Sequence, residues 1–230
     1  MNATNTETTA TCWKCGAGAA EEHFCAKCGA VQKLARGTDH FRFLGLPRKL
    51  WMDMNELEGR FHQLSWKLHP DNFVRATEEE RELALERGSQ LNDAYRVLRD
   101  PVGRVEYLLA IEGMRKEGAQ KQQAPPELLE EVFELNESLD ELRSARAEHQ
   151  DGAGMAALRQ RLEEAARGFE ARLADVDEQL MDAAKEWDAT VDSDDRAAGR
   201  AALARMNEIL NRRSYIRNLV RGVTQELSRK

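Results

Sequence analysis

The chain has 230 residues, of which 33% are charged and 41% apolar, with a formal net charge of -7. This length suffices for one or two domains with apolar cores. The acidic balance argues against a general nucleic-acid binder, and no apolar run approaches the length of a membrane span. Residues 1–11 hold neither a basic residue nor an apolar run, so no secretory signal or transit peptide is expected. We therefore expect a soluble protein of the reducing cytoplasm that binds neither nucleic acid nor membrane.

All four cysteines lie near the N-terminus, in two Cys-x-x-Cys-Gly segments. In each segment two thiolates converge on one point, and the glycine lets the backbone turn tightly behind them. The pair predicts a tetrahedral metal site made by Cys12, Cys15, Cys25 and Cys28. Zinc is the first choice of metal and iron the alternative, because both accept four thiolates. Two disulfides, or one redox Cys-x-x-Cys, fit the paired spacing and the missing secretion signal less well.

The role predicted for this metal is structural, because four cysteines fill its coordination shell and leave no open position. The segment is also too short to build a core, so the metal is expected to hold it together. His23 is interpreted as a surface residue rather than a ligand, and Val31 to Gly37 as a linker.

The next stretch is organised around a turn, Leu68 to Asn72, between two amphipathic helical patterns. Pro70 disfavours helical backbone at His69, so the first helix is expected to end there. Asp71 and Asn72 favour a turn. The sequence therefore predicts that His69 and Asp71 stand at the tip of a helical hairpin.

Capping signals set the bounds of the two hairpin helices. Asp53 with Glu56, and Thr77 with Glu80, each form a capping box at a helix start. The second helix is expected to stop at Asp100–Pro101, since proline cannot continue it. One short helix is predicted within Asp39 to Leu46 and another in Val102 to Ile111. These are all-α elements, and a hairpin tip offers no cleft for an enzyme.

The remainder of the chain predicts three antiparallel helices. Along the first of them, an inward stripe recurs at helical spacing: Leu128, Val132, Leu135, Leu139 and Leu142. An acidic stripe lies beside it, made by Glu130, Glu134, Glu137 and Glu141. For an isolated helix such a stripe is a solvated face. A long apolar seam follows from Met155 to Trp187, and Asp192 to Asp195 is expected to break it and cap the last helix.

The order of short helix, capped helix, His-Pro-Asp turn and long antiparallel helix resembles the J-domain of DnaJ-type co-chaperones. Four segments narrow the resemblance to HscB-type proteins, namely Asp39 to Pro47, Leu68 to Phe73, Leu91 to Leu98 and Asp100 to Leu109. That family joins a J-domain to a helical domain and serves iron–sulfur cluster assembly, and some members carry an N-terminal tetracysteine segment. Asn72 departs from its pattern, because Lys or Arg usually follows the tripeptide.

The resemblance implies that His69, Pro70 and Asp71 stimulate ATP hydrolysis on an HscA/DnaK-type chaperone. Arg60 and Lys67 match the basic face that meets the acidic chaperone surface, where complementary charge steers the encounter. A co-chaperone of this kind is not itself an enzyme.

The resemblance also assigns a partner to the C-terminal domain. Its residues that match the family's surface for an IscU-type iron–sulfur scaffold are Leu129, Phe133, Glu134, Glu137 and Glu141. Two apolar anchors with adjoining acids suit a partner that has apolar and basic patches. Glu130 stands where the family often has an apolar residue.

The predicted organisation has three modules and is monomeric. Residues 1–37 form the tetracysteine segment and linker, 38–115 the J-domain, 116–124 a polar linker and 125–230 the three-helix scaffold-binding domain. Two alternatives to the HscB-type function stay open. One is a general J-domain co-chaperone for unfolded clients, and the other is a zinc or iron tetracysteine binding module.

Overall fold

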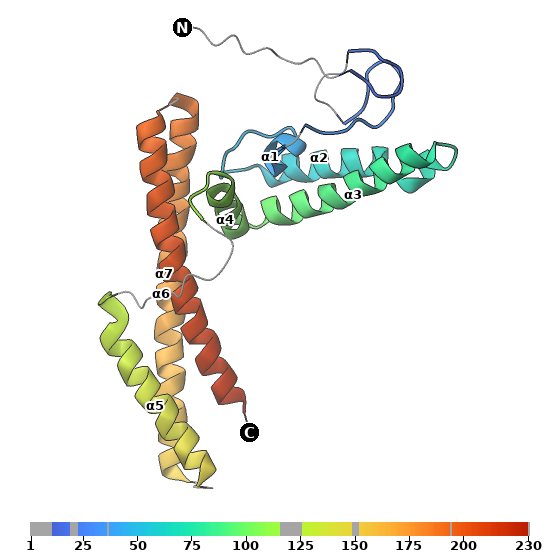
Figure 1. Cartoon of the computed structure of the whole chain (residues 1–230). Helices are drawn as coiled ribbons and strands as arrows, with labels where there is room; N and C mark the ends of the chain where they lie inside the picture. Colours follow the sequence, from blue (N-terminus) through green and yellow to red (C-terminus); the bar gives the residue numbers. More distant parts are fainter. Residues whose placement is uncertain are drawn as a thin grey trace. The chain divides into compact units, whose positions relative to one another are not determined.

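The computed structural model describes residues 11–18, 23–35, 37–115, 126–148, 152–193 and 195–229 (Figure 1). The predicted linker at 116–124 lies outside these residues. The chain divides into one unit that ends at Tyr107 and a second that begins at Leu108. Within the described residues the regular elements are helices, accompanied by two isolated β-bridges near the N-terminus, which confirms the all-α prediction. None of the described helices is long and apolar enough to cross a membrane.

The first unit is organised around an antiparallel pair of helices, α2 and α3 (Figure 1). Its elements in chain order are α1 (His40–Phe43), α2 (Met54–Lys67), η1 (Pro70–Phe73), α3 (Glu78–Arg99) and the start of α4 (Pro101–Ile111). Their apolar faces are buried, and the side chains that solvent does not reach include Phe41, Leu57, Ala94, Leu98 and Val105. The helical periodicity places Leu57, Leu91 and Leu98 in this core, whereas Phe61, Leu64 and Tyr95, at the same spacing, are only half-buried.

The predicted N-caps set the helix starts, but both capping boxes differ from the prediction: in the first, the Glu56 carboxylate contacts Arg60 at 3.4 Å. Asp53 accepts a hydrogen bond from Asn55 N at 2.9 Å, and Thr77 Oγ1 accepts one from Glu80 N at 3.3 Å. The capping box at Thr77 is only half formed, because the carboxylate of Glu80 bonds the Lys14 ammonium at 2.7 Å. A charge partner outweighs a local backbone donor there.

Two buried polar contacts attach α4 to the rest of the first unit. Arg104 is 4% exposed and donates to the backbone oxygen of Leu50 at 2.8 Å. Tyr107 Oη accepts from His40 N at 2.9 Å, and the two rings stack with centroids 4.2 Å apart. Burial lowers the pKa of His40 despite the opposing effect of nearby carboxylates, so the neutral ring is favoured in this stack.

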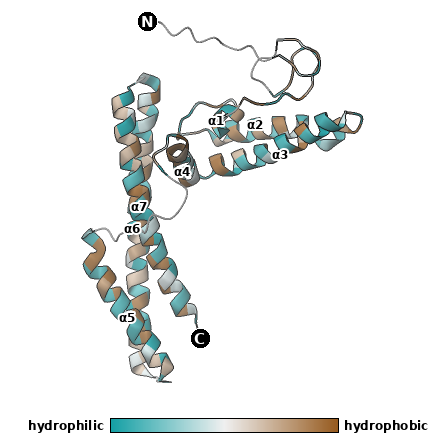
Figure 2. Ribbon diagram, viewed as in Figure 1, coloured by the Kyte–Doolittle hydropathy of each residue, from teal (hydrophilic) through white to brown (hydrophobic). Residues whose placement is uncertain are grey.

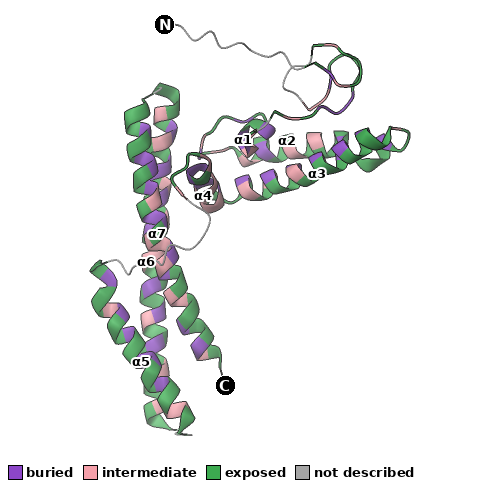
Figure 3. Ribbon diagram, viewed as in Figure 1, coloured by how far each residue is buried: buried purple, intermediate pink, exposed green. Residues whose placement is uncertain are grey.

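The second unit is a bundle of three long helices (Figures 1 and 2), each carrying both hydrophobic and hydrophilic residues. Its elements after α4 are η2 (Pro126–Leu128), α5 (Leu129–Ala147), α6 (Ala153–Ser193) and α7 (Arg196–Ser228). α6 and α7 run antiparallel, and buried residues recur along both (Figure 3). α5 packs against α6 through the predicted leucine and valine stripe, all of whose members are buried. The three-helix prediction is confirmed.

The α6–α7 connection differs slightly from its prediction. α6 continues to Ser193, whose hydroxyl donates to Ala189 O at 3.0 Å, so the polar residues there extend the helix. Asp195 alone caps α7, accepting from Ala197 N and Ala198 N at 3.0 Å each. Gly199 follows, where an added Cβ would lie 3.2 Å from Thr190 Oγ1, so a small residue permits the close approach of the two helices.

Candidate functional site

The His-Pro-Asp turn is a single turn of 3₁₀ helix that projects two polar side chains. His69 is its N-cap, with Nδ1 accepting a hydrogen bond from Asp71 N at 3.3 Å, and Pro70 occupies the first helical position. A neutral His69 that accepts at Nδ1 must carry its proton on Nε2. Both side chains are exposed, His69 by 59% and Asp71 by 85%. The tip can therefore offer a donor and a carboxylate to a partner protein.

Asn72 has a clear structural role in this turn. Its amide nitrogen donates to the backbone oxygens of Trp66, at 2.8 Å, and Lys67, at 3.3 Å. These carbonyls belong to the last turn of α2, where backbone donors are few and Trp66 O has only a long backbone hydrogen bond, from His69 N at 3.4 Å. Asn72 therefore caps the C-terminus of α2 with its side chain. The turn preference of Asn indicates its place in the turn, but the sequence does not show that its side chain caps α2.

The two predicted basic residues lie at different points along α2, and both are exposed. Lys67 is in the last turn, next to the His-Pro-Asp tip, and its ammonium lies 5.9 Å from the centroid of the Phe24 ring. Arg60 lies about two turns earlier and is 3.4 Å from the carboxylate of Glu56. This exposed pair contributes little to stability, so Arg60 can exchange Glu56 for a partner's acid.

The α5 surface combines exposed apolar and acidic side chains, as the sequence predicts. Leu129 and Phe133 are 54% and 70% exposed, which is unusual for large apolar residues in a packed bundle. Glu134 and Glu137 are exposed, and neither forms an ion pair with any residue that the structure describes. Glu141 has only a distant cation, Arg161, at 3.9 Å. This surface therefore has negative charge that ion pairs with described residues compensate only at Glu141.

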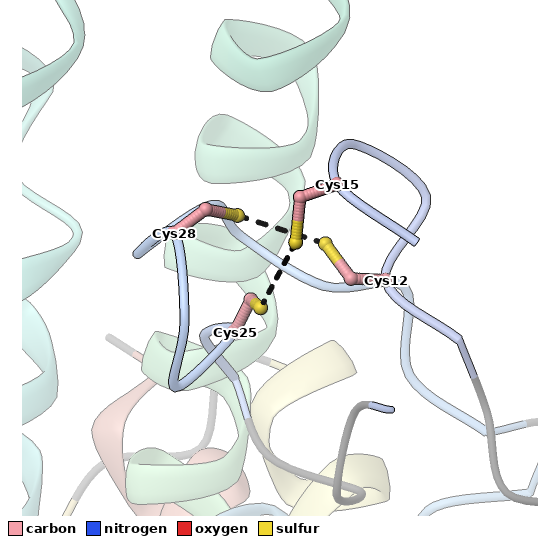
Figure 4. A group of neighbouring side chains, drawn as sticks. All are labelled: Cys12, Cys15, Cys25 and Cys28. Atoms are coloured by element: carbon pink, nitrogen blue, oxygen red, sulfur yellow. Dashed lines mark hydrogen bonds between the residues drawn. The ribbon is translucent and has the colours of Figure 1, made fainter. Parts of the chain in front are cut away.

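The four cysteines come together as a compact cluster of sulfur atoms (Figure 4). All four Sγ atoms lie within 4.8 Å of one another, with Cys12–Cys28 at 3.7 Å and Cys15–Cys25 at 3.8 Å. A tetrahedral zinc site with Zn–S bonds of about 2.3 Å has S···S edges of about 3.8 Å. The cluster could hold a metal ion in that geometry. All four residues are free cysteines, so the disulfide alternative does not describe this structure.

The backbone of the two knuckles turns tightly behind the sulfur atoms and donates hydrogen bonds that affect the pKa values of the thiols. Gly16 and Gly29 follow the second cysteine of each knuckle with φ of +68° and +72°, a conformation that side chains disfavour. Burial opposes the thiolate of Cys12, but hydrogen bonds from the Cys15 and Lys14 backbone overcome this and lower its pKa to about 6. The pKa of Cys28 is raised to about 12: the Ala30 backbone bond favours its thiolate, but burial and the neighbouring sulfurs outweigh it. A bound cation would offset the negative charge of several thiolates close together, which burial and the neighbouring sulfurs otherwise oppose.

Two predictions about the N-terminal segment are wrong. His23 is not a simple surface residue, because its Nε2 lies 2.7 Å from Phe43 O. Its ring also packs edge-on against the Phe43 ring, with the ring centroids 4.6 Å apart. Val31 and Gln32 are not a free linker, since they are 0% and 5% exposed. The knuckles thus contact α1 through His23 and α3 through Gln32, whose backbone oxygen accepts from Arg87. A segment this short has no periodic pattern from which such a contact could be predicted.

Comparisons with known proteins agree with these features. Residues 39–107 match the DnaJ domain family. The co-chaperone protein HscB homolog of Vibrio vulnificus is 36% identical over 155 residues, which cover 67% of this chain and 85% of that protein. The chain belongs to the HscB co-chaperone family. The J-domain and HscB-type resemblances are therefore confirmed.

Two more HscB relatives extend the comparison to animals. The iron-sulfur cluster co-chaperone protein HscB of Mus musculus is 32% identical over 140 residues, covering 59% of this chain and 60% of that protein. The crystal structure of human co-chaperone protein HscB shares the fold, with a TM-score of 0.63 at 23% identity over 94% of this chain and 98% of that one.

Replacing Asn72 with alanine tests the cap. Asn72→Ala removes both hydrogen bonds to the end of α2, so we expect a loss of about 1 kcal/mol in the free energy of unfolding of the J-domain unit. Urea unfolding followed by circular dichroism measures it. The control is Asn92→Ala on the exposed side of α3, which is expected to be neutral or slightly stabilising because alanine favours helix. Equal stability of the two variants would contradict the cap.

Proposed function

We propose that this HscB-family protein acts in iron–sulfur cluster assembly. In this proposal it binds an IscU-type scaffold through α5 and stimulates the ATPase of an HscA/DnaK-type chaperone through His69, Pro70 and Asp71. The observation that carries it is the exposed apolar and acidic surface on α5, in a chain that also presents a His-Pro-Asp tip. The name of the mouse relative supplies the iron–sulfur context.

The chaperone contact follows from charge and rigidity. Lys67 and Arg60 present positive charge on α2, which would speed the encounter with an acidic chaperone surface. The 3₁₀ turn then presents Asp71 to a chaperone arginine and the His69 Nε2–H to an acceptor, with less backbone entropy left to lose because Pro70 fixes its own φ. The ATPase chemistry belongs to the chaperone, whose active conformation this contact favours.

The scaffold contact follows from burial and charge on α5. Phe133 and Leu129 are exposed large apolar side chains, which act as interface anchors when they enter a partner's pockets. Glu134 and Glu137, which form no ion pair among the described residues, and Glu141 beside them would meet basic residues of the scaffold. The general-client alternative lacks a reason for this fixed combination of anchors and acids.

Joining the two contacts in one chain has a physical purpose. A scaffold bound to α5 is carried to the chaperone that the J-domain engages, so its effective concentration at the chaperone rises without any new contact. The tetracysteine cluster is proposed to hold zinc. A redox-inactive ion in a closed thiolate shell suits the structural role that the compact sulfur geometry supports.

The chaperone contact predicts loss of stimulation in His69→Gln. We expect at least a tenfold smaller increase in chaperone ATPase rate, because glutamine cannot reproduce the imidazole that caps the turn and presents Nε2–H. A steady-state ATPase assay with the chaperone and this protein measures it. His62→Gln, the same change at an exposed position earlier on α2, is the control and should stimulate fully. Full stimulation by His69→Gln would refute this mechanism.

The scaffold contact predicts that Leu129→Ala with Phe133→Ala weakens scaffold binding. Loss of two anchors that become buried in the complex should cost about 2–4 kcal/mol of binding free energy, or roughly 30-fold or more in Kd. Isothermal titration with an IscU-type scaffold gives the value, and basal chaperone stimulation should be unchanged. Leu85→Ala removes a 64% exposed leucine from α3 and is the control, with wild-type affinity expected. If the double variant instead lost only its binding to an unfolded client, the general J-domain alternative would replace this proposal.

The metal assignment predicts one zinc ion per chain. Elemental analysis of the purified protein should find zinc near one equivalent, and the solution should be colourless because zinc has no visible ligand-field transitions. Cys15→Ser with Cys28→Ser removes the two exposed ligands and should abolish retention of the metal. A red protein that contains iron would establish the alternative metal.

A further inference from the structure

The tetracysteine knuckles are joined to α3 through two of its buried charged side chains, Arg87 and Glu80. The guanidinium of Arg87 is 3% exposed and donates to Gln32 O at 2.7 Å and to Gln90 Oε1 at 2.9 Å. The carboxylate of Glu80, 8% exposed, accepts from Lys14 at 2.7 Å. A tethered, independent metal module would have no reason to bury two charged groups of a neighbouring helix. These contacts therefore make the knuckles part of the J-domain structure.

Gln32 stands between the sulfur cluster and that helix. Its side-chain amide donates to Cys12 Sγ at 3.4 Å and to Ala30 O at 2.8 Å. Its backbone nitrogen donates to His23 O at 2.8 Å, and its backbone oxygen accepts the Arg87 guanidinium. One buried residue thus contacts a candidate metal ligand on one side and α3 on the other. An N–H donor to a ligand sulfur also orients that ligand.

We propose that Gln32 is a positioning residue that couples metal occupancy of the cysteine cluster to the conformation of α3, so that a bound metal ion stabilises the J-domain hairpin. Without the metal, no core holds the short knuckles together, and Gln32 loses its fixed position. Arg87 and Glu80 would then lose Gln32 O and Lys14 as partners, and the face of α3 that carries them would lose the segment packed against it. The first half of α3 would therefore open more often.

The coupling bears on function because the knuckles and the His-Pro-Asp tip share one end of the hairpin. Glu80 lies in the first turn of α3, shortly after η1. Phe24, next to Cys25, lies beneath the ammonium of Lys67 in the last turn of α2. Metal loss would consequently disturb both helix ends that flank the turn. This inference does not require the scaffold contact, and its test uses neither chaperone nor scaffold.

Thermodynamic coupling is reciprocal: if metal binding stabilises α3 through these contacts, then removing the contacts must weaken metal binding. We expect Gln32→Ala and Arg87→Met each to weaken zinc binding by roughly fivefold or more, although neither changes a cysteine. Competition with a chromophoric chelator on the full chain measures the zinc affinity. Gln63→Ala, at an exposed position on α2, and Arg81→Met, exposed and paired with Glu78 in α3, are the matched controls.

Hydrogen exchange on the wild-type chain supplies the second measurement and requires no variant to fold. Removal of the metal by a chelator should raise amide exchange in the first half of α3, from Glu80 to Leu91, and leave α7 unchanged. Two results would overturn the proposal. One is unaltered α3 exchange after verified metal loss, and the other is a zinc affinity in Gln32→Ala and Arg87→Met equal to that of the controls.

Discussion

The reversal of the chain between α2 and α3 is the constraint on which the J-domain depends. Two helices can pack antiparallel only if the chain turns within a few residues and the carbonyls at the end of the first helix find donors. Pro70 stops α2, Asn72 donates to its last carbonyls, and Phe73, 8% exposed, anchors the turn in the core. His69 and Asp71 remain exposed because Pro70, Asn72 and Phe73 already stop the helix, cap it and anchor the turn. Their exposure is thus a consequence of how the turn is satisfied.

Contacts that are local in sequence could be predicted, and those between distant segments could not. The caps at Asp53, Thr77 and Asp195 and the inward stripe of α5 each depend on neighbours within a few residues, so spacing alone indicates them. The four-cysteine cluster could be predicted as well, because metal geometry restricts ligand spacing strongly.

The partners of Glu80 and Arg87 lie 66 and 55 residues away in sequence, and no repeat relates them. Glu80 even carries a misleading local signal, since Thr77 three residues earlier suggests a complete capping box. Lys14 provides a stronger partner, and only the folded chain brings it close. The surface position predicted for His23 is wrong for the same reason, because its contact with Phe43 arises only when the knuckles dock.

The helical bundle contains two kinds of acidic residue that look alike in sequence: those that form ion pairs within the fold and those that do not. Glu226 is buried and accepts from Arg146 at 2.9 Å, and Glu131 forms an ion pair with Arg172, so both acids serve packing. Glu134 and Glu137 form no ion pair with any described residue and face solvent beside Phe133. Acids already paired inside the bundle have little electrostatic attraction left for a partner, whereas unpaired ones keep theirs. Glu134 and Glu137, which belong to the surface proposed for the scaffold, therefore keep charge that the fold does not neutralise through an ion pair with a described residue.

Asn72 and the knuckles address the same physical problem at the same end of the hairpin. The usual Lys or Arg after the tripeptide would add charge for a chaperone but offers a less fixed cap than a short amide, because its long chain loses more rotamer freedom. This chain keeps the short amide and has Lys67 nearby, resting on Phe24 of the knuckle. A cation held over an aromatic ring is restricted in position while its ammonium remains open to a partner. Lys67 thus places a positive charge at the end of α2, close to the tip, and its contact with Phe24 relies on the docked tetracysteine segment.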